Sequence, residues 1–163
     1  ASVSVEPPMF VDVVNVTSAA DMADVVKSKA AEQDIIIMTA AVADFCPSHP
    51  ADEKIKKNDS SYESVIELER TEDILSYLGA HKAKGQLICG FSMETQNMLE
   101  NSKAKLAKKN ADMIVANNLK VAGAGFGTDT NVVTLITADD CTELEIMDKS
   151  CVAARIMDRL LKM

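Results

Sequence analysis

The fold is indicated first by residues 34–39, which read DIIIMT. Four consecutive large apolar residues are too many for a strand with one face in water, because such a strand alternates apolar and polar residues. A strand that helices cover on both faces explains the run, and strands of this kind lie at the centre of parallel sheets. We therefore predict a central parallel strand here.

Working outward from this strand, helical and strand patterns alternate along the chain. The predicted helices span residues 18–33, 72–80, 96–109 and 149–162. The predicted strands span residues 11–16, 62–69, 86–91, 111–116 and 132–137, and 142–147 pairs with the last of them as a hairpin. This order predicts an α/β, Rossmann-like three-layer fold with a mostly parallel sheet and a late antiparallel hairpin. Because no strand with a Gly-rich turn opens the chain, we expect N-terminal strands of the sheet to be missing.

Two helix starts carry capping residues. Thr17 or Ser18 caps the first helix, and Asp21 stands three residues after Ser18, as in a capping box. Thr71 is the predicted cap of the second helix.

Composition excludes several classes of protein. The chain has 163 residues, which fits a single domain over residues 1–163. Its net charge of −8 argues against partners such as nucleic acid or anionic membranes. No apolar run approaches the ~18 residues of a membrane span. Four widely spaced cysteines and two histidines predict no metal site, and reduced thiols in a cytoplasmic protein explain the cysteines.

The residues after the central strand are candidates for a ligand site, since ligands of open α/β sheets bind beyond the carboxyl ends of the strands. Ala40 and Ala41 leave room for a ligand near the backbone, and Asp44 adds a carboxylate beside them. A tightly packed strand end with Asp44 capping a turn explains the same residues equally well.

Lysines concentrate in two places of this acidic chain. Lys54 and Lys56 share one face of an extended segment, and Lys105 and Lys109 share one face of a helix. Clustered ammonium groups suit a polyphosphate, although solvated charge runs are the commoner explanation of such clusters.

The Gly-rich segment 123–129 reads GAGFGTD. It lacks the Gly-Lys-Ser/Thr ending of a phosphate loop, and a strand follows it where a helix is required. We therefore expect a tight connection that uses glycines for unusual backbone angles, and no dinucleotide fingerprint.

Five ordered motifs together resemble a known family. They are AAVADF at 40–45, EKIKK at 53–57, GFSMET at 90–95, KNADMIVANN at 109–118 and GFGTDTN at 125–131. They resemble the phosphopantothenoylcysteine synthetase domain of bacterial coenzyme A biosynthesis, and the resemblance covers nearly all of the chain from residue 3 onward.

The resemblance implies a cytoplasmic, homodimeric ligase that uses CTP and Mg²⁺. In this family the carboxylate of 4′-phosphopantothenate attacks CTP to give an acyl-cytidylate, and the amine of cysteine then displaces CMP. The domain is usually the C-terminal half of a multifunctional enzyme, so FMN is expected only in a decarboxylase half that this chain lacks. The family's Gly-rich opening segment is likewise expected to be absent, which would leave the fragment inactive alone.

By the same resemblance, Lys54 is the catalytic lysine of a mobile flap at residues 47–58 that closes over the triphosphate. The implied nucleotide-binding residues are Met38, Thr39, Ala40, Asp44, Lys54, Arg70, Thr71, Glu72, Asp73, Phe91, Lys105 and Lys109. The resemblance leaves open whether Asp44 contacts the base, the ribose or a cation, and no residue is assigned as a metal ligand.

Two alternatives stay open from the sequence. A non-catalytic nucleotide-binding fragment or a regulatory module of the same fold agrees with the missing opening segment. A remnant of a Rossmann-type oxidoreductase is disfavoured, because no dinucleotide fingerprint is present.

Overall fold

The computed structural model describes residues 6–51, 53–54, 65–94, 97–118, 125 and 127–163. Its main sheet has the strand order β1-β4-β5-β7-β8. These strands are β1 (Ile35–Met38), β4 (Leu87–Glu94), β5 (Met113–Asn118), β7 (Val133–Ile136) and β8 (Cys141–Glu143). β1, β4 and β5 run parallel, and β7 is antiparallel to both of its neighbours, so it alone is reversed among these five. The predicted mostly parallel sheet with a late antiparallel hairpin is confirmed.

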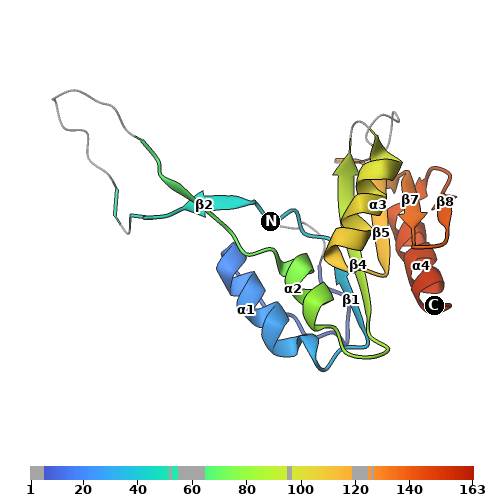
Figure 1. The fold of residues 1–163 in the computed structure, drawn as a ribbon, viewed down its shortest axis with the longest axis horizontal. Helices are drawn as coiled ribbons and strands as arrows, with labels where there is room; N and C mark the ends of the chain where they lie inside the picture. The colour runs from blue at the N-terminus through green and yellow to red at the C-terminus, as the bar shows by residue number, and fades with distance from the viewer. Residues whose placement is uncertain (1–5, 52, 55–64, 95–96, 119–124, 126) are drawn as a thin grey trace.

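Helices cover both faces of this sheet and give three layers (Figure 1). On one face, α4 (Lys149–Leu160) buries Val152, Ile156 and Leu160 against β5 and β7. On the other face, α1 (Ala19–Ala30) and α2 (Ile74–His81) pack over β1 and β4. α3 (Met98–Lys109) contacts β5 next to them. Within the described part of the chain, no helix has the length and apolar character to cross a membrane.

The start of α1 has the predicted capping box. The Ser18 hydroxyl accepts a hydrogen bond from the Asp21 amide at 3.0 Å, and the Asp21 carboxylate accepts from the Ser18 amide at 2.9 Å. The Thr17 hydroxyl donates to the same carboxylate at 2.6 Å. These hydrogen bonds, that of the Thr17 side chain foremost, lower the pKa of Asp21 to about 2.

The backbones of α2 and of the end of α3 approach each other closely at Gly79. A Cβ atom added at Gly79 of α2 would lie 1.7 Å from the carbonyl oxygen of Lys109. The Asn110 side-chain amide donates to the Gly79 carbonyl at 2.7 Å, so a hydrogen bond holds the two helices at this distance. Gly79 is therefore required for space and not for its backbone angles.

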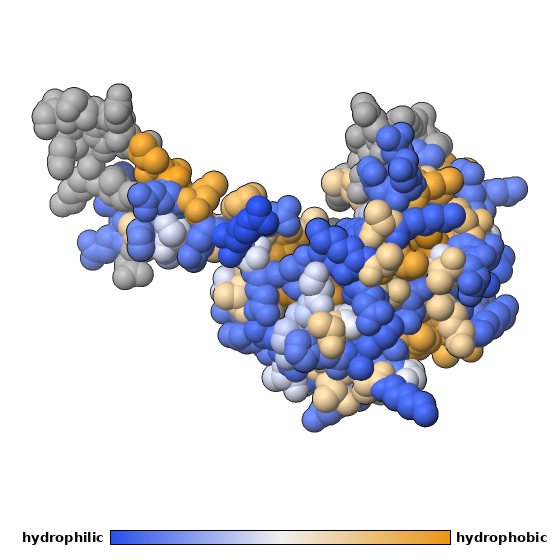
Figure 2. All heavy atoms as spheres, viewed as in Figure 1, coloured by the Kyte–Doolittle hydropathy of each residue, from blue (hydrophilic) through white to orange (hydrophobic). Residues whose placement is uncertain are grey.

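An arm projects from the body of the molecule (Figure 1). It contains the antiparallel pair β2 (Phe45–Pro47) and β3 (Leu68–Arg70). Its large apolar side chains are exposed, with Phe45 at 51%, Leu68 at 59% and Ile66 at 72% of their full accessible area. Figure 2 shows this hydrophobic surface along the arm. The described part of the chain therefore leaves these apolar side chains largely in water.

A second small ladder joins β6 (Thr130–Asn131) to β9 (Met147–Asp148). Gly125 and Gly127 just before it have φ values of 110° and 73°, so the predicted use of glycines for unusual backbone angles is confirmed at these two positions. The rest of the predicted Gly-rich connection lies outside the described residues.

Several predicted details are wrong. Residues 11–16 form no strand, because no described strand lies beside them to complete a ladder. β1 stands at the end of the described sheet, and its four residues are half-buried where a central strand would bury them. The cap of α2 is Asp73 and not Thr71. Residues 62–64 of the predicted strand 62–69, and residues 52 and 55–58 of the predicted flap, Lys56 among them, lie outside the described residues.

The contact at Gly79 predicts that a glycine-to-alanine change destabilises the protein at this position, although the same change usually stabilises a helix. Glycine to alanine inside a helix ordinarily stabilises by about 1 kcal/mol. We expect Gly79→Ala to lower the free energy of unfolding by about 3 kcal/mol, because the new methyl group overlaps the backbone of α3. Urea unfolding measures this, with Ala80→Gly on the exposed side of α2 as the control that reports helix propensity alone, at about 1 kcal/mol. An equally or more stable Gly79→Ala variant would contradict the packing.

Candidate functional site

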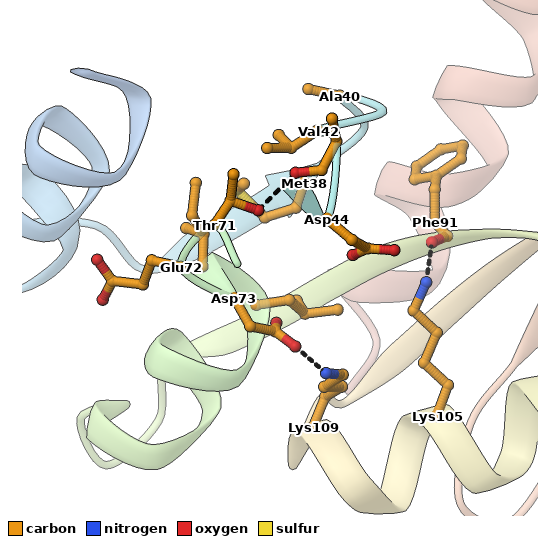
Figure 3. A pocket seen from close by; sticks show the side chains of 13 residues that line it. Met38, Ala40, Val42, Asp44, Thr71, Glu72, Asp73, Phe91, Lys105 and Lys109 are labelled. Atoms are coloured by element: carbon orange, nitrogen blue, oxygen red, sulfur yellow. Dashed lines mark hydrogen bonds and ion pairs between the residues drawn. The ribbon is translucent and has the colours of Figure 1, made fainter. Parts of the chain in front are cut away.

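A cleft lies at the carboxyl end of β1, between the chain that leaves this strand and the first turn of α2. It encloses about 230 Å³. Figure 3 shows its lining, which consists of Met38, Ala40, Val42, Ala43, Asp44, Thr71, Glu72, Asp73, Ile74, Leu75, Phe91, Lys105 and Lys109. The cleft is thus where parallel α/β sheets ordinarily bind ligands.

Hydrogen bonds join the two segments that form one wall of the cleft. The Thr71 hydroxyl donates to the Ala43 carbonyl at 2.5 Å, and the Thr71 amide donates to the Asp44 carbonyl at 3.0 Å. The Asp44 side chain extends into the cleft in Figure 3 and takes part in no ion pair with any described residue. Thr71 therefore fixes the backbone around this carboxylate and leaves the carboxylate itself available.

Lys105 enters the cleft from α3. Its ammonium group donates to the Phe91 carbonyl oxygen at 2.8 Å, and the side chain is half-buried. Among the described residues no carboxylate lies within 4.0 Å of this nitrogen. A carbonyl is a neutral partner, so the positive charge of Lys105 has no counter-ion here.

Lys109, one helical turn further along α3, has a different environment. Its ammonium group forms an ion pair with the Asp73 carboxylate and donates to the Ser76 hydroxyl at 3.0 Å. Its side chain is only 14% exposed. Asp73 also caps α2 by accepting a hydrogen bond from the Ser76 amide at 2.9 Å. Lys109 therefore ties α3 to the first turn of α2.

The ion pair perturbs the acidity of Asp73. Partial burial raises the pKa of this carboxyl, but the hydrogen bonds from Lys109 and the Ser76 amide and the charge of Lys109 lower it further. The net pKa of Asp73 is below its ordinary value of 3.8. Asp73 is therefore ionised at neutral pH.

Glu72 contributes its backbone side to the cleft but turns its carboxylate toward α1 (Figure 3). There it accepts from the Lys27 ammonium at 2.6 Å, and this ammonium lies 5.3 Å from the centre of the Tyr77 ring. Glu72 thus has its own counter-ion outside the cleft.

The structure brings most of the predicted site residues together. Those that line the cleft are Met38, Ala40, Asp44, Thr71, Glu72, Asp73, Phe91, Lys105 and Lys109. Thr39, Lys54 and Arg70 do not line it. Arg70 belongs to β3 of the arm, where its guanidinium carbon lies 5.7 Å from the centre of the Phe45 ring. Lys54 follows β2 along the arm and is exposed.

The sequence missed four lining residues, Val42, Ala43, Ile74 and Leu75. Small or apolar side chains give no chemical signal of a site, and only their position next to Asp44 and Asp73 pointed to it. No group of three or more His, Cys, Asp or Glu side chains in the described residues is placed to hold a metal ion.

The comparisons with known proteins agree on one family. The family model for the DNA/pantothenate metabolism flavoprotein C-terminal domain matches residues 1–163. The coenzyme A biosynthesis bifunctional protein CoaBC of Bacillus subtilis (strain 168) is 46% identical over 95% of this chain. A cysteine/cysteine sulfinic acid decarboxylase of an unknown prokaryotic organism is 45% identical over 93% of it.

A solved structure extends this agreement to the fold. The crystal structure of the C-terminal domain of a CoaBC protein matches with a TM-score of 0.79 and 40% identity, over 99% of this chain and 72% of that one. The chain spans only 38% and 42% of the lengths of the two relatives above.

The Asp73–Lys109 pair predicts how stability depends on pH. Because the pKa of Asp73 is lower in the folded protein than in the unfolded chain, its contribution is complete above pH ~4 and is lost as the pH falls through the lowered pKa. We expect Asp73→Asn to be less stable than the parent in urea unfolding at pH 7, and the difference to shrink on acidification below pH ~4. Asp139→Asn, at an exposed carboxylate without an ion pair among the described residues, serves as the control. A difference that does not depend on pH would contradict the role of the pair.

Proposed function

The chain belongs to the family of the DNA/pantothenate metabolism flavoprotein C-terminal domain, and from this membership we propose that it is a phosphopantothenate–cysteine ligase of coenzyme A biosynthesis. The observation that carries the proposal is the cleft itself. In a chain with a net charge of −8, two lysines enter one cleft at the carboxyl end of the sheet. Cations collected against the overall charge favour an anionic ligand such as a nucleoside triphosphate.

The proposed reaction has two steps. A carboxylate oxygen of 4′-phosphopantothenate attacks the α-phosphorus of CTP, the bond to the β-phosphate oxygen breaks, and pyrophosphate leaves. The amine of cysteine then attacks the acyl carbon, loses a proton, and CMP leaves as the amide forms. Both steps build negative charge on phosphoryl or acyl oxygens, and fixed cations stabilise such charge.

The described residues supply parts of this chemistry. Lys105, which has no counter-ion among them, provides the first cation for the phosphates, and Lys109 provides a second. Met38, Ala40 and Phe91 form the walls against which the base and ribose lie. The choice of CTP over other nucleotides rests on the family resemblance.

Mg²⁺ fits this site as a companion of the phosphates. Mg²⁺ is usually held by one or two carboxylates together with phosphate oxygens. Asp44 is the carboxylate of the cleft that lacks an ion-pair partner among the described residues, so it is the protein group that would hold the ion. The bound cation would supply charge neutralisation of the triphosphate.

We propose that Lys54 acts on the cleft of a second copy of the chain. The arm that carries it points away from the body, so it leads away from the cleft of the same chain (Figure 1). The arm exposes Phe45, Ile66 and Leu68, and apolar side chains exposed together are typical of an interface. We place this arm against a partner copy in a homodimer, where Lys54 reaches the partner's cleft and acts on the triphosphate.

The overall proposal is tested by product analysis. Joined to the Gly-rich opening segment of the family, the chain with CTP, Mg²⁺ and 4′-phosphopantothenate should release pyrophosphate, and added cysteine should release CMP and give the amide. CTP should also raise the melting temperature while NADH should not, because only a ligand that binds the folded state stabilises it. Stabilisation by CTP without any turnover would favour a nucleotide-binding module that is not an enzyme.

Lys105 gives a sharp test of the binding mode. We expect Lys105→Gln to weaken CTP binding about 10- to 100-fold, as expected for the loss of a charged hydrogen bond of ~1.5–3 kcal/mol. Isothermal titration calorimetry at low salt measures the affinity. Lys103→Gln, on the exposed side of the same helix, should change it little and is the matched control. Equal affinities of the two variants for CTP would show that Lys105 does not contact the ligand.

Mixing two inactive variants tests whether the arm acts between copies. In the active protein, Lys54→Ala and Lys105→Gln should each abolish most turnover. If Lys54 acts on the partner's cleft, each mixed dimer contains one intact site, and an equal mixture should recover roughly a quarter of the parental rate. If Lys54 acts within its own chain, no site is intact and no activity returns. The second result would overturn the assignment of the arm to the partner.

A further inference from the structure

The two lysines of the cleft are not equivalent, although both point into it (Figure 3). We propose that Asp73 is a positioning residue that acts as an internal counter-anion: it holds Lys109 against α2, so a polyphosphate gains Lys109 only by displacing Asp73. Lys105 is open to the ligand from the start. The inference rests on the proposed function, because the ligand that competes with Asp73 is taken to be a nucleotide polyphosphate.

The first support is the way Lys109 is held. An ammonium group has three N–H donors. Two of those of Lys109 are used by Asp73 and by the Ser76 hydroxyl, both at the start of α2. With its side chain only 14% exposed, Lys109 has little freedom to turn toward a ligand while these contacts last.

The second support is that Asp73 is itself fixed but accessible. One of its carboxylate oxygens accepts from the Ser76 amide as the helix cap, and the other receives Lys109. Its side chain is 51% exposed and lines the cleft. A phosphate oxygen can therefore approach the pair, and Asp73 cannot follow Lys109 away from α2 without losing the cap.

The third support is the contrast with Lys105. Its only described partner is the neutral carbonyl of Phe91, so no ion pair has to break before it binds an anion. Glu72, the neighbour of Asp73 in sequence, is neutralised by Lys27 outside the cleft. Asp73 is thus the carboxylate of the described cleft that is paired with a cleft cation.

The proposal predicts the direction in which Asp73→Asn changes the affinity for anions. A phosphate that binds Lys109 must break an existing ion pair and then lies next to the uncompensated Asp73 carboxylate. Asp73→Asn keeps an oxygen for the helix cap but removes the competing charge, since asparagine caps helices as well as aspartate does. The substitution should therefore tighten anion binding, whereas the loss of an ordinary binding residue weakens it.

The test uses inorganic tripolyphosphate, which has the charge of a triphosphate and no base. Calorimetry without Mg²⁺ gives its dissociation constant for the parent chain, Asp73→Asn, Lys109→Gln and the double variant. We expect Asp73→Asn to bind about 5- to 10-fold more tightly than the parent, and this gain to disappear in the Lys109→Gln background. Glu72→Gln removes one negative charge at the neighbouring position and should give a clearly smaller gain.

Several results would overturn the inference. Equal or weaker binding by Asp73→Asn would do so, and so would a gain that persists in the Lys109→Gln background, since that gain is only long-range charge. Failure of all four proteins to bind tripolyphosphate would overturn it as well. If Asp73→Asn is poorly folded, Asp73→Ser repeats the test with another good capping residue.

The same series separates this inference from the ligase proposal. A gain that depends on Lys109, seen with tripolyphosphate, supports the role of Asp73 whether or not the protein turns over CTP. A protein that binds CTP no better than tripolyphosphate and forms no amide would refute the ligase function and leave the competition at Lys109 demonstrated.

Discussion

The close contact of α2 with the end of α3 at Gly79 is the constraint on which the described site depends. The backbone carbonyl of Lys109 occupies the space that any side chain at this position would need, and Asn110 fixes the approach by its hydrogen bond to Gly79. At this distance Lys109 reaches across to the first turn of α2 and pairs with Asp73. The packing of the two helix backbones thus sets the distance between α2 and α3, and this distance brings Lys109 and Asp73 together.

Electrostatics then gives the cleft its character. The chain as a whole carries a net charge of −8, so Lys105 and Lys109 make the surroundings positive only within the cleft. Of the two lysines, one is neutralised within the protein and the other has only a carbonyl for a partner. On the proposal above, an anionic ligand can bind Lys105 directly, whereas it gains Lys109 only after the ion pair with Asp73 has broken.

The arm adds a second constraint, which concerns assembly. Exposed apolar side chains on a thin projection gain nothing for an isolated chain, because they bury little surface on folding. Pairing with another copy would remove this surface from water and would bring Lys54 from one copy to the cleft of the other. Dimerisation would then bury the apolar side chains of the arm and complete the site at the same time.

Local sequence patterns were enough to predict the order of most elements and most of the charged side chains that line the cleft. The DIIIMT strand, the Ser18 capping box and the late hairpin all follow from local patterns, which need only near neighbours. The ordered motifs also identified the family and most of the residues that line the cleft. Only the tertiary structure decided that residues 11–16 form no strand and that Asp73 replaces Thr71 as the cap of α2. It also decided that Lys109 is paired while Lys105 is not, because such partners are set by distances between segments far apart in the chain.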